Sequence, residues 1–305
     1  MALAAIAAPA ASAQPQLTRR RGGVIVLALL LPGVLYLTLF FLVPFVSLVI
    51  TSFGINDTEV YGAYYYGFEW HNYVDVIAEF WPHFLRSFAF ALVATVLSLL
   101  IGFPIAYFIG VRLRERALLR NFLLVLVIAP FFISFLLRTL AWKQIFADEG
   151  AIVAGLRAIG ILGAQGHLTG TTFSVIFGLT YNFIPFMTLP LYTTLERLDV
   201  RLLDAASDLY ASPAVAFGRV TLPLAMPGIV SGTLLTFIPA TGDYVNASQA
   251  FLGSPSTAMI GNVVQSKFLV TVNYPQAAAV SIILMIVIVV IVSIYVRRAG
   301  TEELL

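Results

Sequence analysis

The sequence contains no cysteine, which excludes disulfide bonds, thiol nucleophiles and cysteine-based haem or zinc sites. Charge is also scarce, because only 10% of the 305 residues are Asp, Glu, Lys or Arg, against about 25% in a soluble domain. A soluble fold of this size could not cover its surface with so few charged side chains. Hydrophobic residues make up 60% of the chain, and the mean hydropathy is +0.96. The composition therefore predicts a protein whose solvent is mostly lipid.

Motifs for nucleotide, metal and covalent chemistry are missing as well. The two lysines, Lys143 and Lys267, lie outside any GxxxxGK[ST] phosphate-binding loop. HExxH does not occur, and His71, His83 and His167 are too scattered in the sequence to predict a metal site. No Ser/His/Asp arrangement follows from the spacing. We expect a protein that is not an enzyme, that carries no cofactor or metal and binds no nucleic acid, and that takes any energy from ATP through another chain.

Long stretches without charge predict the membrane-spanning helices, since about 20 apolar residues cross a bilayer. Such runs are too long and too continuous for barrel strands, which need only about 10 alternating residues. The predicted fold is therefore all-α, a polytopic membrane protein with six transmembrane helices. The six candidate spans are Gly22–Asn56, Ser87–Val111, Asn121–Leu137 with an extension to Trp142 left open, a run from near Thr171 that ends before Glu196, Val220–Gly242 and Phe268–Val296.

The positions of Lys and Arg predict the orientation, because cytoplasmic loops carry an excess of both. With the N-terminus inside, twelve of the 17 basic residues lie on the inner side and five on the outer side. Both termini are thus expected in the cytoplasm. Residues 1–21 are expected to form a disordered cytoplasmic tail, 22–298 the transmembrane domain with a polar loop at 196–227, and 299–305 a cytoplasmic C-terminus.

Two outer segments and one small-residue motif complete the outline. Phe53–Pro82 is rich in Tyr and Trp, which indicates an interfacial aromatic belt or a contact surface for a soluble partner. Phe146–Gly170 is rich in Gly and Ala and is consistent with a short helix on the membrane surface. Gly228 and Gly232 form a GxxxG motif, which allows two helices to approach closely.

The loop at 196–227 is too structured for a simple connector. Four apolar side chains share one face at helical spacing, and Ser212-Pro213 is a typical start for a second short helix. The apolar ridge consists of Leu202, Ala205, Ala206 and Leu209. Nothing within the loop itself can bury this ridge, so we expect it to dock into a groove on a partner.

The spacing of this loop resembles the EAA motif, EAA-x3-G-x9-I-x-LP, of ATP-binding cassette importer permeases. Asp204-Ala205-Ala206, position 210, and Val220 with Leu222-Pro223 match it at every step. Asp204 replaces the usual Glu and keeps the charge. Tyr210 replaces the usual Gly, which adopts φ > 0 freely where Tyr cannot without cost. The turn is therefore either wound differently, or Tyr210 adds apolar contact with the partner.

This resemblance implies a MetI-like permease subunit of a type I importer, located in the bacterial inner membrane. Its implied partners are an ATPase dimer that binds the ATP, a second permease subunit, and an extracytoplasmic substrate-binding protein. The sequence leaves open whether the second permease is a copy of this chain or a different one, and the similarity to polyamine permeases described below implies a different one. The residues implied to contact the ATPase are Asp204, Ala205, Ala206, Leu209, Tyr210 and Leu222.

The segment Phe237–Tyr244, with Leu252-Gly253 and Ile260–Asn262 downstream, is similar to the fifth span of spermidine/putrescine permeases. That similarity implies a polyamine substrate. Polyamines are polycations, and carboxylates and aromatic faces stabilise ammonium groups. The residues expected along the substrate path are Asp243, Tyr244, Tyr181, Asn182 and Phe186. For Asp243, a helix-capping role in the outer loop is an equal alternative.

Three other functions stay open on the residues alone. The same machine could carry another small solute, such as another amine, an oxyanion or ferric iron. A self-sufficient secondary transporter or channel would place ionisable residues deep in its spans, where this chain has almost none. A membrane-embedded enzyme would need a catalytic cluster, and the sequence offers none. Of the transporter and enzyme functions considered, an ATP-driven permease subunit is the interpretation that accounts for the loop at 196–227.

Overall fold

A computed structural model describes residues 22–57, 59–163 and 165–299 of the chain. The predicted tail at 1–21 and almost all of the predicted C-terminal segment lie outside these ranges. The chain divides into two units after Leu48. The described part of the first unit is one apolar helical stretch: α1 (Gly22–Leu37), the π-helix η1 (Thr38–Leu42) and α2 (Val43–Ser52), whose last turn belongs to the second unit.

The second unit contains the remaining helices and one small hairpin. The hairpin pairs β1 (Ile55–Asn56) with β2 (Tyr64–Tyr65) in antiparallel register, with Ile55 opposite Tyr65. The helices are α3 (His71–Tyr107), η2 (Phe108–Arg112), α4 (Ala117–Ile128), η3 (Ala129–Phe132), α5 (Phe135–Ile145), α6 (Ala151–Ala158), α7 (Thr172–Glu196), α8 (Arg201–Asp208), α9 (Pro213–Ala216), η4 (Phe217–Thr221), α10 (Leu222–Leu224), α11 (Met226–Thr241), η5 (Pro255–Thr257), α12 (Ile260–Gln265), η6 (Ser266–Val270) and α13 (Tyr274–Ala299).

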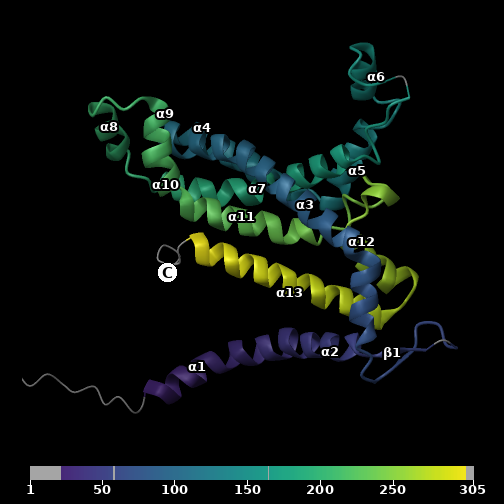
Figure 1. The fold of residues 1–305 in the computed structure, drawn as a ribbon. Helices are drawn as coiled ribbons and strands as arrows, with labels where there is room; N and C mark the ends of the chain where they lie inside the picture. Colours follow the sequence, from purple (N-terminus) through teal and green to yellow (C-terminus); the bar gives the residue numbers. More distant parts are fainter. Residues whose placement is uncertain (1–21, 58, 164, 300–305) are drawn as a thin grey trace, which may run out of the picture. The chain divides into compact units, whose positions relative to one another are not determined.

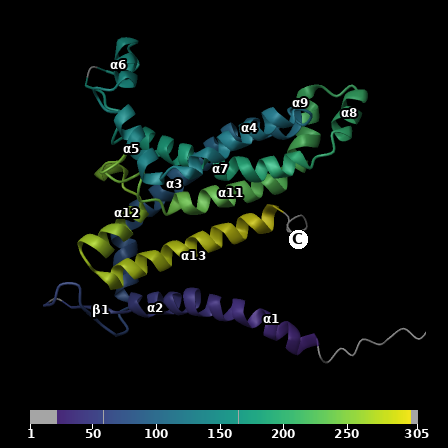
Figure 2. The same ribbon diagram turned by 180° about the vertical axis from the view of Figure 1, so that it is seen from behind.

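Helices α3, α7 and α11 lie side by side and form the centre of this unit, with α13 packed against α3 (Figures 1 and 2). Three apolar clusters follow one another along α3. Ala106 and Ile109 pack with α7 residues such as Leu195 at one end. Ala91 and Ala94 pack with α7 in the middle. Val76 and Phe80, at the other end, pack with α12 and α13. Burial of this apolar surface orders the helices around α3.

The GxxxG motif lies where α11 approaches α7. A Cβ atom on Gly232 would be 2.7 Å from the sulfur of Met187, and one on Gly228 would be 2.8 Å from the hydroxyl of Thr194. Both distances are too short for a real side chain, so the two backbones depend on glycine here. The predicted packing role of the motif is confirmed.

The six-helix prediction agrees with the structure once two spans are counted as bent. Four described helical stretches are long and apolar enough to cross a membrane: Ala28–Ser52, His71–Arg112, Thr172–Glu196 and Tyr274–Arg298. Two further spans are bent pairs, Ala117–Phe132 with Phe135–Ile145 at 94° and Pro213–Leu224 with Met226–Thr241 at 65°. The charge-free runs therefore located every span but could not reveal the bends.

One predicted boundary was wrong by several turns. Helix α3 begins at His71 and not near Ser87, so the second half of the predicted outer segment Phe53–Pro82 is helical. The helix continues because Asp75, Glu79 and Arg86 do not interrupt helical hydrogen bonding, and only the lipid requires their absence. A short helix does occur in the segment Phe146–Gly170, at α6.

Candidate functional site

The loop at 196–227 contains the helix–turn–helix that its sequence predicts. The first helix is α8 and the second is α9, where the hydroxyl oxygen of Ser212 accepts the backbone N–H of Val215 at 3.4 Å. Both helices lie at one end of the α3, α7 and α11 bundle, while α6 and α12 lie toward the other end (Figure 1). We call residues 196–227 the coupling loop below.

The turn after α8 has the conformation expected for the usual Gly of the motif, although Tyr210 occupies that position. Tyr210 has φ 57, which is the left-handed conformation that glycine adopts in related motifs. The N–H of Ala211 bonds to the carbonyl of Ala206 at 3.0 Å, and the N–H of Tyr210 bonds to that of Ser207 at 2.9 Å. These two bonds define a Schellman motif. Tyr210 thus has the backbone conformation that glycine favours at this position, and this conformation costs a tyrosine free energy.

Most of the predicted docking surface is exposed. The side chains of Leu209 and Tyr210 are 81% and 97% exposed, and Leu202 is 46% exposed. Asp204 and Ala205 are exposed, while Ala206 is half-buried. Leu222, on α10, is 38% exposed. Within the chain, α8 contacts α9 and η4, and its Leu203 packs on the cluster at that end of α3. Leu209 and Tyr210 therefore form an apolar tip that no other described part of the chain covers.

Two arginines hold the start of the coupling loop against the bundle. Arg114 donates to the carbonyl oxygens of Glu196 and Leu198, the latter at 2.8 Å. Arg120, on α4, lies 3.3 Å from the carboxylate of Glu196. Since Glu196 is the last residue of α7, these contacts connect the loop before α4 to the point where the coupling loop begins.

A buried polar network connects α5, α7 and the segment after α11. The carboxylate of Asp243 accepts the backbone N–H of Asn246 at 2.8 Å and its side-chain amide at 3.1 Å. The oxygen of that amide accepts a bond from Asn182 at 3.2 Å, and Asn182 also donates to Thr139 at 3.2 Å. Asp243 is 8% exposed and has no basic partner within 4 Å among the described residues. The carboxylate accepts the backbone N–H three residues on, as a capping side chain does.

Aromatic side chains surround the remaining predicted path residues. Tyr181 packs edge-on against Trp142, with ring centroids 5.2 Å apart, and it lines a groove of about 600 Å³ formed with α3 and α4. Phe186, also on α7, packs against Phe131 at 4.9 Å. Arg138, on α5, lies with its guanidinium 5.8 Å from the ring centroid of Phe135. The bend between α4 and α5 thus brings α5 aromatic and basic groups onto α7.

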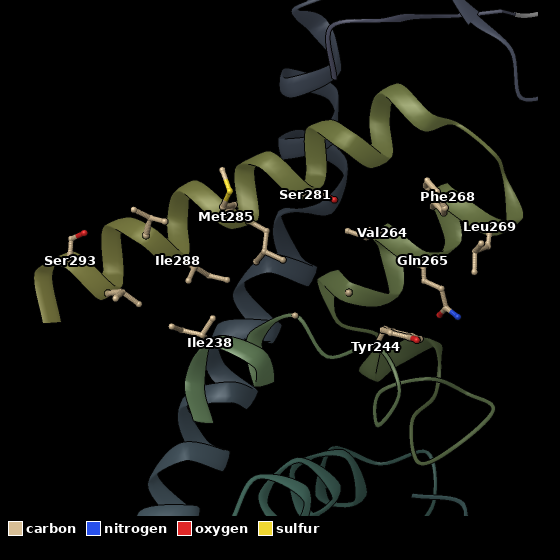
Figure 3. A pocket seen from close by; sticks show the side chains of 15 residues that line it. Ile238, Tyr244, Val264, Gln265, Phe268, Leu269, Ser281, Met285, Ile288 and Ser293 are labelled. Atoms are coloured by element: carbon tan, nitrogen blue, oxygen red, sulfur yellow. The ribbon is translucent and has the colours of Figure 1, made fainter. Parts of the chain in front are cut away.

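Tyr244 lines a different groove. This groove, of about 710 Å³, lies between the end of α11, the α12–η6 segment and α13 (Figure 3). Its lining is mainly apolar, and Ile238, Phe268, Met285 and Ile288 make up much of it. Tyr244 is 45% exposed there, while the neighbouring Asp243 side chain is turned toward Asn246.

The structure therefore separates the predicted path residues into four places. Asn182 and Asp243 belong to the buried network, and Tyr244 lines the groove beside α13. Tyr181 packs with Trp142 and Phe177, and Phe186 packs with Phe131 and Phe183. The sequence analysis missed Thr139 and Asn246, which complete the network. The spacing of Asp243 and Asn246, three residues apart, is a signal that could have indicated this capping-type bond.

Comparison with known proteins assigns the family. Residues 98–299 match the model of the binding-protein-dependent transport system inner membrane component. The chain belongs to this family. It is therefore a multi-pass inner membrane protein and a non-catalytic transport component. The match contains the coupling loop, four whole spans and the last part of the span His71–Arg112.

Curated relatives of this binding-protein-dependent component cover most of its length. It is 36% identical over 263 residues to the spermidine/putrescine transport system permease protein PotB of Haemophilus influenzae, covering 86% of this chain and 90% of that one. PotB of Escherichia coli is 34% identical, with 86% and 93% covered. The inner membrane ABC transporter permease protein YdcU of Escherichia coli is 31% identical, with 72% of each chain covered.

Solved structures agree with this family fold. A bacterial ABC transporter involved in the import of the acidic polysaccharide alginate matches with a TM-score of 0.66 at 18% identity, covering 93% of this chain and 97% of that one. The MetNI methionine ABC transporter matches with a TM-score of 0.54 at 20% identity, covering 72% and 93%. At these identities the likeness concerns the fold alone, and it confirms the predicted MetI-like permease architecture.

Proposed function

We propose that this chain is the membrane-spanning permease subunit of an ATP-driven importer of polyamines. The family match and the relatives named spermidine/putrescine permeases support both the machine and the substrate class. The observation that carries the coupling role is the apolar tip of Leu209 and Tyr210, which is exposed at the end of a helix closed by a Schellman motif. An exposed apolar tip on a fixed helix fits a groove on a partner.

The partners proposed for the complete importer are an ATPase dimer, a second permease and an extracytoplasmic substrate-binding protein. ATP would be bound by the ATPase subunits, since this sequence has no phosphate-binding loop. Movement of the ATPase would act on Asp204, Ala205 and the apolar tip, and the contacts of Arg114 and Arg120 with the end of α7 would pass it to the bundle.

For the substrate path, we propose that aromatic faces make the direct contacts with the ammonium groups. Tyr181 and Tyr244 retain exposed ring surface in grooves, which suits a cation–π contact. Asp243 and Asn182 lie behind them in the buried network. The negative charge of Asp243 would attract the cationic substrate without direct contact, because a buried carboxylate without a basic partner draws cations to the neighbouring surface. Phe186 would shape the cavity on α7.

The proposed orientation places the coupling loop and both termini in the cytoplasm and the β1–β2 hairpin outside. A chain without cysteine allows a direct test, because single cysteines can be introduced without removing others. In intact cells, a membrane-impermeant maleimide should label Tyr66→Cys on the hairpin side and leave Ser207→Cys on α8 unlabelled until the cells are opened. The reverse pattern would invert the topology.

The function is tested by reconstituting the complete transporter in lipid and measuring ATP hydrolysis with a panel of loaded binding proteins. Spermidine or putrescine should stimulate hydrolysis, and Leu209→Ala together with Asp204→Asn should abolish the stimulation. Leu118→Ala is the matched control, since Leu118 is 90% exposed but lies outside the coupling loop, and it should hydrolyse like wild type. Stimulation only by another amine, an oxyanion or ferric iron would keep the machine and reject the polyamine. No stimulation in an intact assembly would reject the machine.

A further inference from the structure

A cavity lies between the coupling loop and the end of the second span. Its volume is about 850 Å³, and its walls come from the last turn of α3, η2, the loop before α4, α8 and the segment from α9 to η4. On α8 the wall includes Leu203 and Ser207, whereas Leu209 and Tyr210 are not part of it. The cavity is therefore a separate feature from the apolar tip that we propose for ATPase docking.

Three arginines give this cavity a basic wall. Arg114 is half-buried and donates to carbonyl oxygens at the start of the coupling loop. Arg112 and Arg116 are exposed, and no carboxylate of the described residues lies within 4 Å of either. Two acids also line the cavity, Glu115 and Asp204, so one positive charge remains in excess. Guanidinium groups bind phosphate oxygens through paired, charge-assisted hydrogen bonds, which makes an anion with a phosphate group a suitable ligand.

The position of these arginines along the second span corresponds to the level of the lipid headgroups. The charge-free run of that span ends at Val111, and Arg112 follows directly. In the proposed orientation this end of the span is cytoplasmic. The cytoplasmic leaflet carries anionic lipids, and basic pockets between spanning helices on that side bind their headgroups. The phosphate of a lipid is therefore available at the depth of the basic wall.

The basic cavity adjoins an apolar groove within the membrane-spanning part. This groove is the one of about 600 Å³ between α3, α4 and α7, and Phe108 lines both the cavity and the groove. Beyond Phe108 the groove lining is apolar and includes Pro104, Ile105, Ile109, Leu123, Leu126 and Val127. A small anion such as inorganic phosphate would leave this groove unfilled. A basic site that continues into an apolar groove fits an anion with a hydrocarbon chain.

The basic cavity is distant from the residue proposed to meet the substrate in the same groove. Tyr181 precedes Glu196 by about 22 Å along α7, at 1.5 Å per helical residue. Glu196 lies at the cavity end, because its carbonyl accepts a bond from Arg114. Tyr181 and the basic cavity are thus at opposite ends of the groove, so an anion bound at the cavity does not occupy the proposed cation contact.

We propose that the cavity and the groove together bind one anionic phospholipid of the cytoplasmic leaflet. The phosphate binds Arg112 and Arg116, and an acyl chain lies along the groove from Phe108. The inference rests on the proposed orientation of the chain. It does not depend on the solute or on ATP hydrolysis, because its readout is lipid binding, so its failure and the failure of the proposed function are separate results.

The test titrates phosphatidylglycerol onto the complete transporter in detergent and counts bound lipids by native mass spectrometry, without ATP or solute. Arg112→Gln together with Arg116→Gln should weaken the binding of one lipid by about 30-fold, or about fivefold for each arginine. Arg297→Gln together with Arg298→Gln is the matched control, because it removes the same charge from the end of α13, outside the cavity. This control should bind phosphatidylglycerol like wild type.

Two further arms separate the headgroup from the acyl chain. Phosphatidylcholine, which has no net charge, should bind more weakly than phosphatidylglycerol to the wild type and equally to the wild type and the Arg112/Arg116 variant. Leu126→Trp should weaken phosphatidylglycerol binding with the arginines intact, since Leu126 lines the groove and is 51% exposed. The inference is overturned if both arginine pairs weaken binding equally or if phosphatidylcholine binds as tightly as phosphatidylglycerol. It is also overturned if Leu126→Trp has no effect while inorganic phosphate displaces the lipid, since the site would then be one for a free anion.

Discussion

Replacement of Tyr210 by glycine should change the stability of α8 and its binding to the ATPase in opposite directions. Tyr210 has φ 57, and an L-residue in the left-handed region loses about 1–2 kcal/mol relative to glycine. Its ring is 97% exposed and stabilises nothing in the described chain. Tyr210→Gly should therefore strengthen the Schellman turn by about 1 kcal/mol or more. It should also weaken docking, since the ring is part of the proposed apolar tip.

Hydrogen exchange is the suitable assay for the first effect, because α8 is a local element and global unfolding would not report on it. The amides of Tyr210 and Ala211 close the turn on Ser207 and Ala206. A gain of 1–2 kcal/mol slows exchange through local opening by about 5- to 30-fold. Exchange of the peptide that contains position 211 should slow accordingly in Tyr210→Gly, while α4 peptides should exchange unchanged.

Tyr210→Ala separates the two effects. Alanine removes the ring but retains a Cβ in the left-handed region, so it should lose docking without gaining stability. The ATPase affinity of both variants should fall together, measured by titration of the ATPase onto the reconstituted permease. Equal exchange rates for Tyr210→Gly and Tyr210→Ala would refute the argument from backbone strain. Unchanged affinity in Tyr210→Ala would remove the ring from the docking surface.

Three further outcomes follow from packing and polar contacts. Gly232→Ala should destabilise the fold by about 1–3 kcal/mol, since its Cβ would meet Met187 at 2.7 Å, while Gly155→Ala, with open space around it, should be neutral or stabilising in the same thermal unfolding assay. Asn246→Ala should cost about 1–3 kcal/mol, because it leaves Asp243 and Asn182 with unused groups, and a loss below about 0.5 kcal/mol would contradict the network. Arg114→Gln should lower the ratio of stimulated to basal ATP hydrolysis far more than Arg120→Gln. Arg114 donates to two carbonyl oxygens at the start of the coupling loop. Arg120 makes one partly exposed ion pair, and such pairs contribute little.

The sequence predicted the spans well because lipid imposes a simple rule on them. In a bilayer, a charge-free run of sufficient length forms a helix, because backbone groups must bond within the segment. The predicted run from near Thr171 to before Glu196 corresponds to α7, which spans Thr172–Glu196. The bends were not predicted. Pro130 marks the 94° break of the third span, but proline also occurs inside α7, at Pro185 and Pro190, without ending that helix. Tertiary packing decides which proline interrupts a helix.

The coupling loop shows a second limit of sequence reasoning. The spacing of the motif located α8, the cap at Ser212 and the exposed tip, because each depends on residues close in sequence. Tyr210 left two conformations open, since the left-handed cost of a tyrosine is small compared with the two hydrogen bonds of the turn it closes. Local propensity alone could not decide between them.

Asp243 and Arg138 show why charged residues near a membrane are hard to assign from sequence. A lone carboxylate beside an aromatic residue suggested a cation contact, but the direction of its side chain is set by Asn246, three residues later. Asn246 is in turn held by Asn182, which lies on α7 and donates to its side-chain oxygen. Arg138 is the reverse case, because its donors find no acceptor in the described chain. One charge is satisfied internally and the other is not. The carboxylate of Asp243 therefore belongs to a loop whose polar contacts are made within the chain.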